Sequence, residues 1–321
     1  MNTFGNRFRV SIFGESHGPQ IGITVDGVPH GISLSEADFS EDIARRAPGA
    51  AGTTPRHEAD EPHILSGVFE GHTTGAPLCI TFANSNTHSS DYSEFTDKPR
   101  PGHADFVASL KWDGDNDPRG GGHFSGRITL PIVAAGVIAK KVLDGVDFSA
   151  RLVEIGGCSD SSKWDAMLKE TAAEGDSLGG IVECTVKNLP IGLGEPFFDS
   201  VEALISHAIF SIPGVRGIEF GDGFAAAAMK GSQHNDPFGP EGPTKNGAGG
   251  VNGGITNGAD LRFRVAFKPT ASIARAQQTW NYREEKMDTL KVKGRHDVCF
   301  ALRTPVIVEA MAAIVLADLY L

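Results

Sequence analysis

Residues Leu130 to Leu143 read LPIVAAGVIAKKVL and are apolar on nearly every side up to the two lysines. A helix that is apolar all round is buried on most of its faces. A second stretch of this kind runs from Pro305 to Leu319, with a proline suited to the first helical turn and one acidic residue, Glu309. The sequence therefore predicts a fold built around two buried helices.

Strands and a capped helix are predicted near the N-terminus. Phe8–Ile12 alternates apolar and polar residues, and Ile21–Val28 has the composition of a second strand. Ser35 and Asp38 then stand at the two positions of a capping box, which predicts a helix that ends near Arg46.

Two segments share one outline. Val25–Gly31 and Val186–Gly192 both read V-x-x-[VL]-P-x-G, and each follows a predicted strand and precedes a predicted helix. The second of these helices spans Asp199–Ile212, and a Pro-Gly pair ends both units (Pro48-Gly49 and Pro213-Gly214). A duplicated strand–loop–helix unit explains the likeness, and so does chance.

Composition limits the function classes. Hydrophobic residues make up 40% and charged residues 21% of the 321-residue chain, as in ordinary globular proteins, and no linker divides it, so we expect one domain over 1–321. The net charge is 29 − 40 = −11, which argues against nucleic-acid or membrane-surface binding. The four cysteines are far apart and predict no zinc site, and with no apolar leader they favour a reducing, cytoplasmic location.

Glycine is abundant, at 40 of 321 residues against about 7% in average proteins. Two stretches, Asn84–Arg100 and Gly231–Asp260, are too long for idle connections and are predicted to be functional or disordered loops.

The segment Gly14-Glu-Ser16-His17-Gly18 matches G-x-S-x-G, the nucleophile elbow of α/β-hydrolases. The elbow requires a helix directly after it, whereas Pro19 and an alternating strand pattern follow here. A serine hydrolase that uses Ser16 stays open as an alternative to a plain turn.

Arg100-Pro-Gly-His103-Ala-Asp105 ends the first long loop. His103 and Asp105 have the spacing of two metal ligands, but no third ligand or H-E-x-x-H pattern stands nearby. The start of a helix with a partly buried histidine explains the segment equally well, and no metal is predicted.

Several glycine-rich loops carry cations. In Asp117–Arg127, three successive glycines stand between Arg119 and His123, a composition suited to a phosphate cradle, or to a glycine hinge. Loops with related features are Asn246–Gly254, Lys268–Ser272 and Gly294–Asp297. In an acidic protein this concentration favours a site for a multiply charged small molecule over scattered ion pairs.

Taken together, these segments resemble the chorismate synthase family over essentially the whole chain. The matching motifs are F-R-V-x-x-F-G-E-S-H-G (8–18), V-D-G-V-P (25–29), R-R-x-P-G (45–49), L-S-G-V-F-E-G (65–71), R-P-G-H-A-D (100–105), R-G-G-G (119–122), G-D-G-F (221–224), K-P-T-x-S-I (268–273) and G-R-H-D (294–297).

The resemblance implies a carbon–oxygen lyase of the shikimate pathway and of aromatic amino acid biosynthesis. Its reaction is the anti-1,4-elimination of phosphate and a ring proton from 5-enolpyruvylshikimate 3-phosphate, which gives chorismate and requires reduced FMN. It also implies an α+β fold, a β-α-β sandwich with long helices between antiparallel sheets, and a homotetramer. Because no flavin-reductase segment is appended, an external reductase is expected to supply the reduced FMN, with NADPH acting only indirectly as reductant.

The resemblance also assigns roles. His17 is expected to give a proton to the departing phosphate, His103 to stabilise the reduced flavin, and Asp297 to help take up the ring proton. Arg45, Arg46 and Arg127 are expected to bind phosphate groups of the substrate or NADPH. The expected flavin contacts are His123, Phe124, Ser125, Gly253, Lys268, Pro269, Thr270, Ala271, Ser272 and Arg295.

The chain departs from the family pattern after Arg119–Gly122. The family usually continues R-S-S-A-R-E-T, whereas this chain has His123, Phe124 and Ile128 at the first, second and sixth of these positions. An arginine expected near Gly52 is also absent. A flavin-binding homologue without catalytic activity therefore remains a further alternative.

Overall fold

The computed structural model describes residues 1–54, 58–85, 94–240, 242–293 and 296–321. The helices are α1 (Ser40–Arg46), α2 (Asp105–Lys111), α3 (Thr129–Val142), α4 (Trp164–Ala173), α5 (Val201–Ile209), α6 (Gly231–His234) and α7 (Pro305–Tyr320). The strands are β1 (Thr3–Phe4), β2 (Arg9–Gly14), β3 (Gln20–Asp26), β4 (His63–Ser66), β5 (Val68–Phe69), β6 (His72–Thr73), β7 (Leu78–Ala83), β8 (Asp147–Ile155), β9 (Gly180–Lys187), β10 (Val215–Phe220), β11 (Phe238–Gly239), β12 (Gly242–Pro243), β13 (Val251–Asn252), β14 (Ile255–Thr256), β15 (Leu261–Phe267), β16 (Gln277–Asn281) and β17 (Lys286–Leu290).

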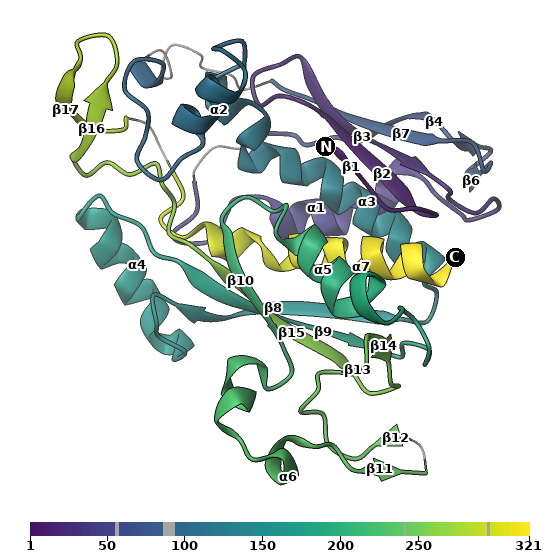
Figure 1. The fold of residues 1–321 in the computed structure, drawn as a ribbon. Coiled ribbons are helices and arrows are strands. Elements are labelled where there is room, and N and C mark those ends of the chain that lie inside the picture. Colours follow the sequence, from purple (N-terminus) through teal and green to yellow (C-terminus); the bar gives the residue numbers. More distant parts are fainter. Residues whose placement is uncertain (55–57, 86–93, 241, 294–295) are drawn as a thin grey trace.

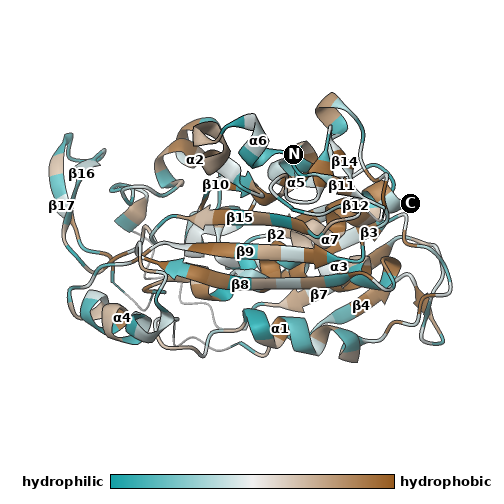
Figure 2. Ribbon diagram, turned by 90° about the horizontal axis from the view of Figure 1, so that it is seen from below, coloured by the Kyte–Doolittle hydropathy of each residue, from teal (hydrophilic) through white to brown (hydrophobic). Residues whose placement is uncertain are grey.

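Two antiparallel sheets enclose a layer of helices (Figure 1). The first sheet has the order β1-β2-β3-β7-β4, and the second has the order β10-β15-β9-β8. Helix α3 packs on β3 and β7 of the first sheet, and α7 packs on β8 and β9 of the second. Seen from below in Figure 2, the second sheet carries many hydrophobic residues on β9 and β15. The predicted α+β class is confirmed.

The two sheets share a topology. When the other elements between them are left out, the first half runs β2, β3, α1, β4, β7, α3, and the second runs β8, β9, α5, β10, β15, α7. In each sheet the fourth of these strands lies between the second and the third. The repeated V-x-x-[VL]-P-x-G segments follow β3 and β9, which are equivalent positions. This agreement is what a duplicated unit would produce, and the duplication itself stays a prediction.

The elements predicted from the sequence are present with small shifts. The capping box is formed, because the Asp38 carboxylate accepts a hydrogen bond from the Ser35 backbone N–H at 2.7 Å, ahead of α1. Helix α5 starts slightly later than predicted, because the cap is Ser200, whose Oγ accepts from the Ala203 N–H at 3.1 Å.

The second long glycine-rich stretch is not a featureless loop. Its described residues, 231–240 and 242–260, include α6 and the two short strand pairs β11–β12 and β13–β14. Of the first stretch, residues 86–93 lie outside the described part of the chain. No helix among the described residues is long and apolar enough to cross a membrane.

A buried carboxylate anchors the N-terminal segment. Asp318, near the end of α7, accepts hydrogen bonds through Oδ1 from the backbone N–H groups of Asn6, Arg7 and Phe8 at 2.6–2.8 Å. These bonds fix the chain just before β2, the strand that leads to Ser16 and His17.

The central contact of the fold is between α3 and α7. All residues of α3 from Thr129 to Ala139 are buried, and so are those of α7 from Val306 to Asp318. At the crossing, a Cβ atom placed on Gly136 would lie 2.3 Å from the Cβ of Ala310. The absence of a side chain at Gly136 therefore allows the two backbones to approach this closely.

This packing predicts that Gly136→Ala destabilises the protein. Alanine favours a helix by about 1 kcal/mol over glycine. Overpacking a tight core costs about 1–3 kcal/mol. The new methyl group would meet the Cβ and backbone atoms of Ala310, which cannot rotate away, so we expect a net loss in the free energy of unfolding. Denaturant unfolding measures it, with Gly231→Ala as control, because a Cβ there meets nothing within 4 Å. Equal stability of Gly136→Ala and the unaltered protein would contradict the close contact.

Candidate active site

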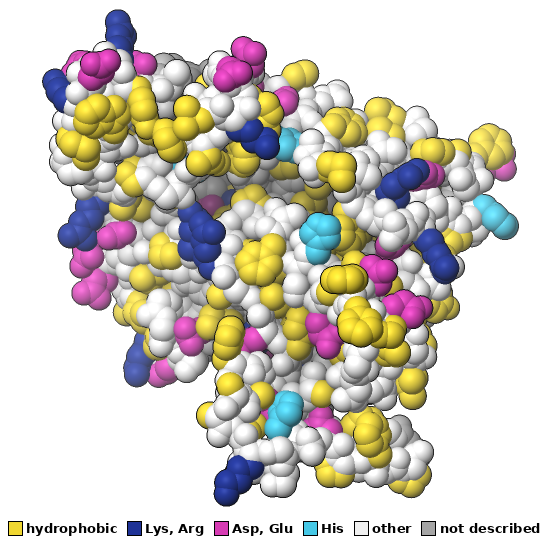
Figure 3. Space-filling view, viewed as in Figure 1, with side chains coloured by type: hydrophobic (Ala, Val, Ile, Leu, Met, Phe, Trp, Pro, Cys, Tyr) yellow, Lys and Arg dark blue, Asp and Glu magenta, His cyan; other side chains and the backbone are white. Residues whose placement is uncertain are grey.

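A cavity of about 880 Å³ opens beside the N-terminal ends of α3 and α7. This volume is in the range of ~300–1,000 Å³ typical of small-molecule sites. Figure 3 shows the molecular surface hollowed below the α2 region, with Lys and Arg side chains near the rim. Six cationic side chains line the cavity: Arg46, Arg100, Arg127, Arg216, Lys268 and Arg303.

The three glycines after Arg119 separate two histidines. Gly120, at φ 61°, lies against the His17 ring, and a Cβ atom there would be 2.5 Å from its Cδ2. A Cβ on Gly121 would lie 3.5 Å from Nε2 of His103. His103 and Gly120 line the cavity, whereas the buried His17 is not among the lining residues, although its ring lies against Gly120. The glycine run thus lets both rings approach one backbone segment.

His103 is oriented by a buried carboxylate. Its Nδ1 lies 2.6 Å from Oδ1 of Asp105, which also accepts from Arg100. Burial opposes ionisation of Asp105, but the hydrogen bonds from Arg100 and His103 outweigh it and hold the pKa well below its usual range. Nδ1 also lies 3.0 Å from an NH2 group of Arg100, so Asp105 and Arg100 together fix this edge of the ring, and Nε2 is left for the side near Gly121.

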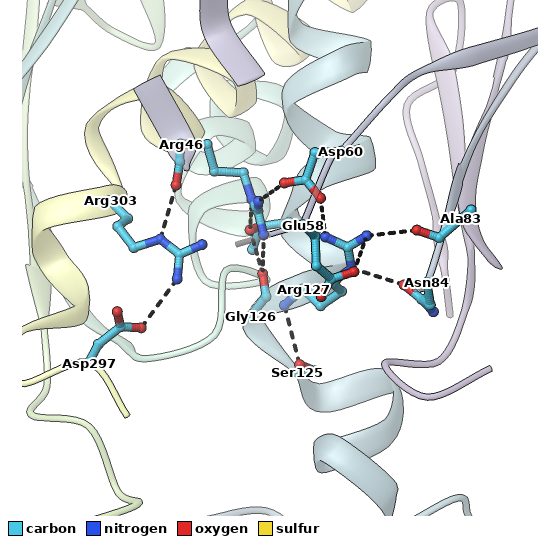
Figure 4. A network of polar contacts seen from close by, with 11 residues as sticks. Arg46, Glu58, Asp60, Ala83, Asn84, Ser125, Gly126, Arg127, Asp297 and Arg303 are labelled. Carbon is cyan, nitrogen blue, oxygen red and sulfur yellow. Dashed lines mark hydrogen bonds and ion pairs between the residues drawn. The ribbon is translucent and has the colours of Figure 1, made fainter. Parts of the chain in front are cut away.

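Two arginines share one carboxylate in the cavity wall (Figure 4). Arg46, on α1, donates to Oδ2 of Asp60 at 3.2 Å, and Arg127 donates to its Oδ1. Arg127 is also bonded to the carbonyl of Ala83 and the side-chain oxygen of Asn84. Burial and the nearby Arg303 lower the pKa of Arg46 to about 9, so its guanidinium remains charged at neutral pH.

Asp297 and Arg303 join this wall from the segment that leads into α7. Asp297 accepts from the Thr54 N–H at 2.7 Å and pairs with Arg303 at 3.3 Å. Arg303 also donates to the backbone carbonyl of Arg46 at 3.0 Å. The predicted residues Arg46, Arg127 and Asp297 are therefore brought together.

The predicted flavin segments also face this cavity. His123, Phe124, Ser125 and residues 268–272 all line it. Nδ1 of His123 donates to the Gly14 carbonyl at 2.7 Å, which fixes that ring. The Thr270 hydroxyl is buried and has no hydrogen-bond partner among the described residues. Cations, hydroxyls and an unsatisfied buried oxygen are the groups that a phosphate-bearing cofactor such as FMN requires, so the residues present fit it.

Arg45 points elsewhere, although it is adjacent to Arg46. It pairs with the buried Glu309 of α7 at 2.6 Å and with Asp42, and Lys140 completes this core network. Neighbouring helical positions are rotated by about 100°, so one arginine faces the core network and the other the cavity. Arg45 does not line the cavity, and its position gives no support to phosphate binding.

Gly253 lies at the turn between β13 and β14 and does not line the cavity. The same holds for the whole glycine-rich segment 246–254, which Figure 1 shows near the end of the molecule opposite α2. Arg295 lies outside the described residues. Within a single chain, the segment 246–254 therefore does not join the other loops at this cavity, and the flavin contact at Gly253 stays a prediction.

Two cavity carboxylates, Glu58 and Asp60, were not found from the sequence. Asp60 has a φ of 50°, which non-glycine residues rarely adopt and which often marks functional sites. In the sequence, the only indication that these two residues belong to the site is that two acidic residues stand two positions apart.

The hydrolase alternative loses its structural basis. Ser16 lies in the turn of the β2–β3 hairpin, and its N–H donates to the Gly122 carbonyl at 3.1 Å. A strand follows instead of the helix that the nucleophile elbow requires. Among the described residues, no cluster of three His, Cys, Asp or Glu side chains has the geometry of a metal site.

Comparisons with known proteins agree with this geometry. A family model described as chorismate synthase matches residues 8–321. A chorismate synthase from Chitinophaga pinensis is 58% identical over 100% of this chain and 97% of its own length. One from Korarchaeum cryptofilum is 46% identical over 98% and 96%. A crystal structure of a chorismate synthase, 26% identical, superimposes with a TM-score of 0.75 over 98% of this chain and 92% of that chain.

The buried Arg100–Asp105–His103 group predicts a pH-dependent effect of Asp105→Asn. Because the pKa of Asp105 is lowered in the folded state, its stabilisation is present above the unfolded pKa of about 3.9 and is lost as pH falls. At pH 7 we expect Asp105→Asn to cost roughly 3 kcal/mol of unfolding free energy, because Arg100 loses its buried partner. Denaturant unfolding at pH 7 and pH 3.5 tests this. A difference between the two proteins that grows on acidification would contradict the assignment.

Proposed function

Because the chain belongs to the chorismate synthase family, we propose that the cavity beside α3 and α7 is where it carries out that family's reaction. The reaction is the elimination of phosphate and a ring proton from 5-enolpyruvylshikimate 3-phosphate to give chorismate, and the family requires reduced flavin. The observation that carries the proposal is the convergence of His103, Asp297 and the arginines Arg46, Arg127 and Arg303 on one cavity.

Charge supports the choice of this cavity. The substrate carries two carboxylates and a phosphate, and FMN carries another phosphate. A protein of net charge −11 attracts such ligands only where cations are concentrated locally, and six cationic side chains line this cavity. Preorganised guanidinium groups in a largely buried wall stabilise the charge that develops on departing phosphate.

We assign the proton transfers to His17 and Asp297, and the stabilisation of the reduced flavin to His103. His17 gives a proton to the departing phosphate, which is supported by the contact of its ring with Gly120 in the cavity lining. His103 stabilises the reduced flavin through Nε2, because Asp105 holds its Nδ1. Asp297 is held in place by the hydrogen bond from the Thr54 N–H and by its ion pair with Arg303, and it helps to take up the ring proton of the substrate.

The flavin is held by His123, Phe124, Ser125 and residues 268–272. When bound, reduced FMN supplies an electron-rich ring beside the substrate. Lys268, whose Nζ donates to the Gly102 carbonyl, joins this segment to the loop that carries His103. Phe124 lies 5.9 Å from Trp112 between ring centroids and offers an apolar wall where the family usually has serine.

The assembly and supply of reduced flavin follow the family. We propose a homotetramer, which is supported by strongly exposed aromatic side chains such as Phe197 (88%) and Phe198 (91%). An external reductase supplies the reduced FMN, and NADPH acts through it. Four free cysteines support a reducing, cytoplasmic location.

An anaerobic assay tests the proposed roles. Protein, substrate and FMN are mixed with and without dithionite, while phosphate and chorismate are measured. We expect equal release of both products with reduced FMN only. His17→Ala and His103→Ala should each lose roughly 10²–10⁴-fold in turnover while still binding flavin, because the first removes the proton donor to phosphate and the second the group that stabilises the reduced flavin. The exposed His72 provides the control variant, His72→Ala, which should be unaffected. Near-normal turnover in both active-site variants would overturn the assignment, and flavin binding without turnover in the unaltered protein would favour a non-catalytic homologue.

Gly120→Ala tests the position of His17 separately. The new Cβ would meet the ring, and displacement of the ring should lower turnover by roughly 10²-fold or more. Gly145→Ala is the matched control, since Gly145 also has a positive φ (81°) but nothing lies within 4 Å of its Cβ position. If both variants lost activity equally, backbone strain rather than His17 would be the cause.

A further inference from the structure

Glu58 is an incompletely satisfied carboxylate in the cavity wall. Its side chain is 19% exposed and pairs with Arg127, whose NH2 lies 3.0 Å from Oε2. That oxygen is buried and accepts no hydrogen bond of good geometry from the described residues. A backbone hydrogen bond from Ser85 is the other polar contact of the carboxylate. A buried carboxylate oxygen of this kind carries a large desolvation cost.

Arg127 does not depend on Glu58 for its position. Its NH1 donates to Asp60, its Nε to Asn84 at 2.9 Å, and its NH2 to the Ala83 carbonyl at 3.1 Å. Figure 4 shows these partners around the guanidinium group, with Glu58 on one side. If Glu58 withdrew, the guanidinium would stay anchored and would have one N–H edge available for another anion.

Burial favours the neutral form of Glu58, whereas the cations around it favour the charged form. Desolvation raises the pKa of Glu58 and Asp60 adds to the rise, while Arg127, the backbone hydrogen bond from Ser85 and Arg46 oppose it without cancelling it. Arg303 stands beyond Arg46 and pairs with Asp297. A ligand with several negative charges, placed in the same cavity, adds repulsion to the ionised carboxylate and raises its pKa further.

Resting on the function proposed above, we propose that Glu58 takes up a proton from solvent when the anionic substrate binds, and so releases Arg127 to pair with the substrate. The carboxylate becomes a carboxyl group, and no bond of the substrate is made or broken in this step. The new O–H donates a hydrogen bond to a substrate oxygen, in place of the repulsion between two anions. Glu58 thus couples binding to proton uptake.

Calorimetry of substrate binding without flavin tests this coupling, because no turnover occurs. At pH 8 the substrate phosphate, with a second pKa of about 6, is fully ionised and takes up no proton itself. Titrations in two buffers of different ionisation enthalpy give the number of protons bound. We expect the unaltered protein to take up as much as about one proton for each substrate bound. Glu58→Gln should take up almost none.

The pH dependence of affinity gives a second readout. Between pH 7 and 9, the affinity of the unaltered protein should fall by up to about tenfold per pH unit, whereas that of Glu58→Gln should change little. Glu61→Gln is the matched control, because Glu61 is exposed in the same segment and should behave like the unaltered protein. Thermal unfolding of each variant verifies that it is folded.

The possible outcomes separate the two proposals. Substrate binding by the unaltered protein without proton uptake would overturn the coupling, whatever the variants do. Equal uptake in Glu58→Gln and the unaltered protein would overturn it as well, since other groups would then be the source. Absence of substrate binding in every protein would overturn the proposed function, and this inference with it.

Discussion

The close packing of α3 against α7 is the constraint on which the site depends. Gly136 and Ala310 let the two apolar helices touch, and each helix then covers one sheet. Both helices begin beside the same cavity, α3 two residues after Arg127 and α7 two residues after Arg303. Arg46 connects the two starts, because its Nε donates to Thr129 and its carbonyl accepts from Arg303. Helix N-termini favour anions. The contact that stabilises the core therefore also brings together the groups that bind a charged ligand.

Several arginines of this cavity are paired with carboxylates of the cavity wall, and an excess of positive charge remains. Asp60 links Arg46 to Arg127, and Asp297 holds Arg303, so these guanidinium groups have partners before any ligand is present. Preorganised ion pairs keep the arginines oriented but must be partly exchanged when a polyanion binds. Glu58 is the carboxylate with the weakest set of partners among them, which makes it the natural one to be neutralised.

The two buried helices, the capped helices and several of the segments that line the cavity were predictable, because they leave local signals. An apolar run without a polar face identified the buried helices. Glycine next to arginine or histidine identified the loops 117–127 and 294–297, and a lysine followed by two hydroxyl side chains identified 268–272. The sequence could not show that Arg45 and Arg46 face opposite environments, since the partner of Arg45, Glu309, comes from the far end of the chain. It gave equally little indication that residues 246–254 lie away from the cavity or that Glu58 and Asp60 line it. Those facts depend on tertiary packing and on backbone conformation, such as the positive φ of Asp60.

The most direct test of this account is a structure of the protein with FMN and 5-enolpyruvylshikimate 3-phosphate bound. We predict the phosphate or a carboxylate of the substrate within hydrogen-bond distance of the Arg127 guanidinium, and the flavin against Phe124 and residues 268–272. Substrate bound outside the cavity, or Arg127 still paired with Glu58 in the complex and making no contact with the substrate, would contradict it.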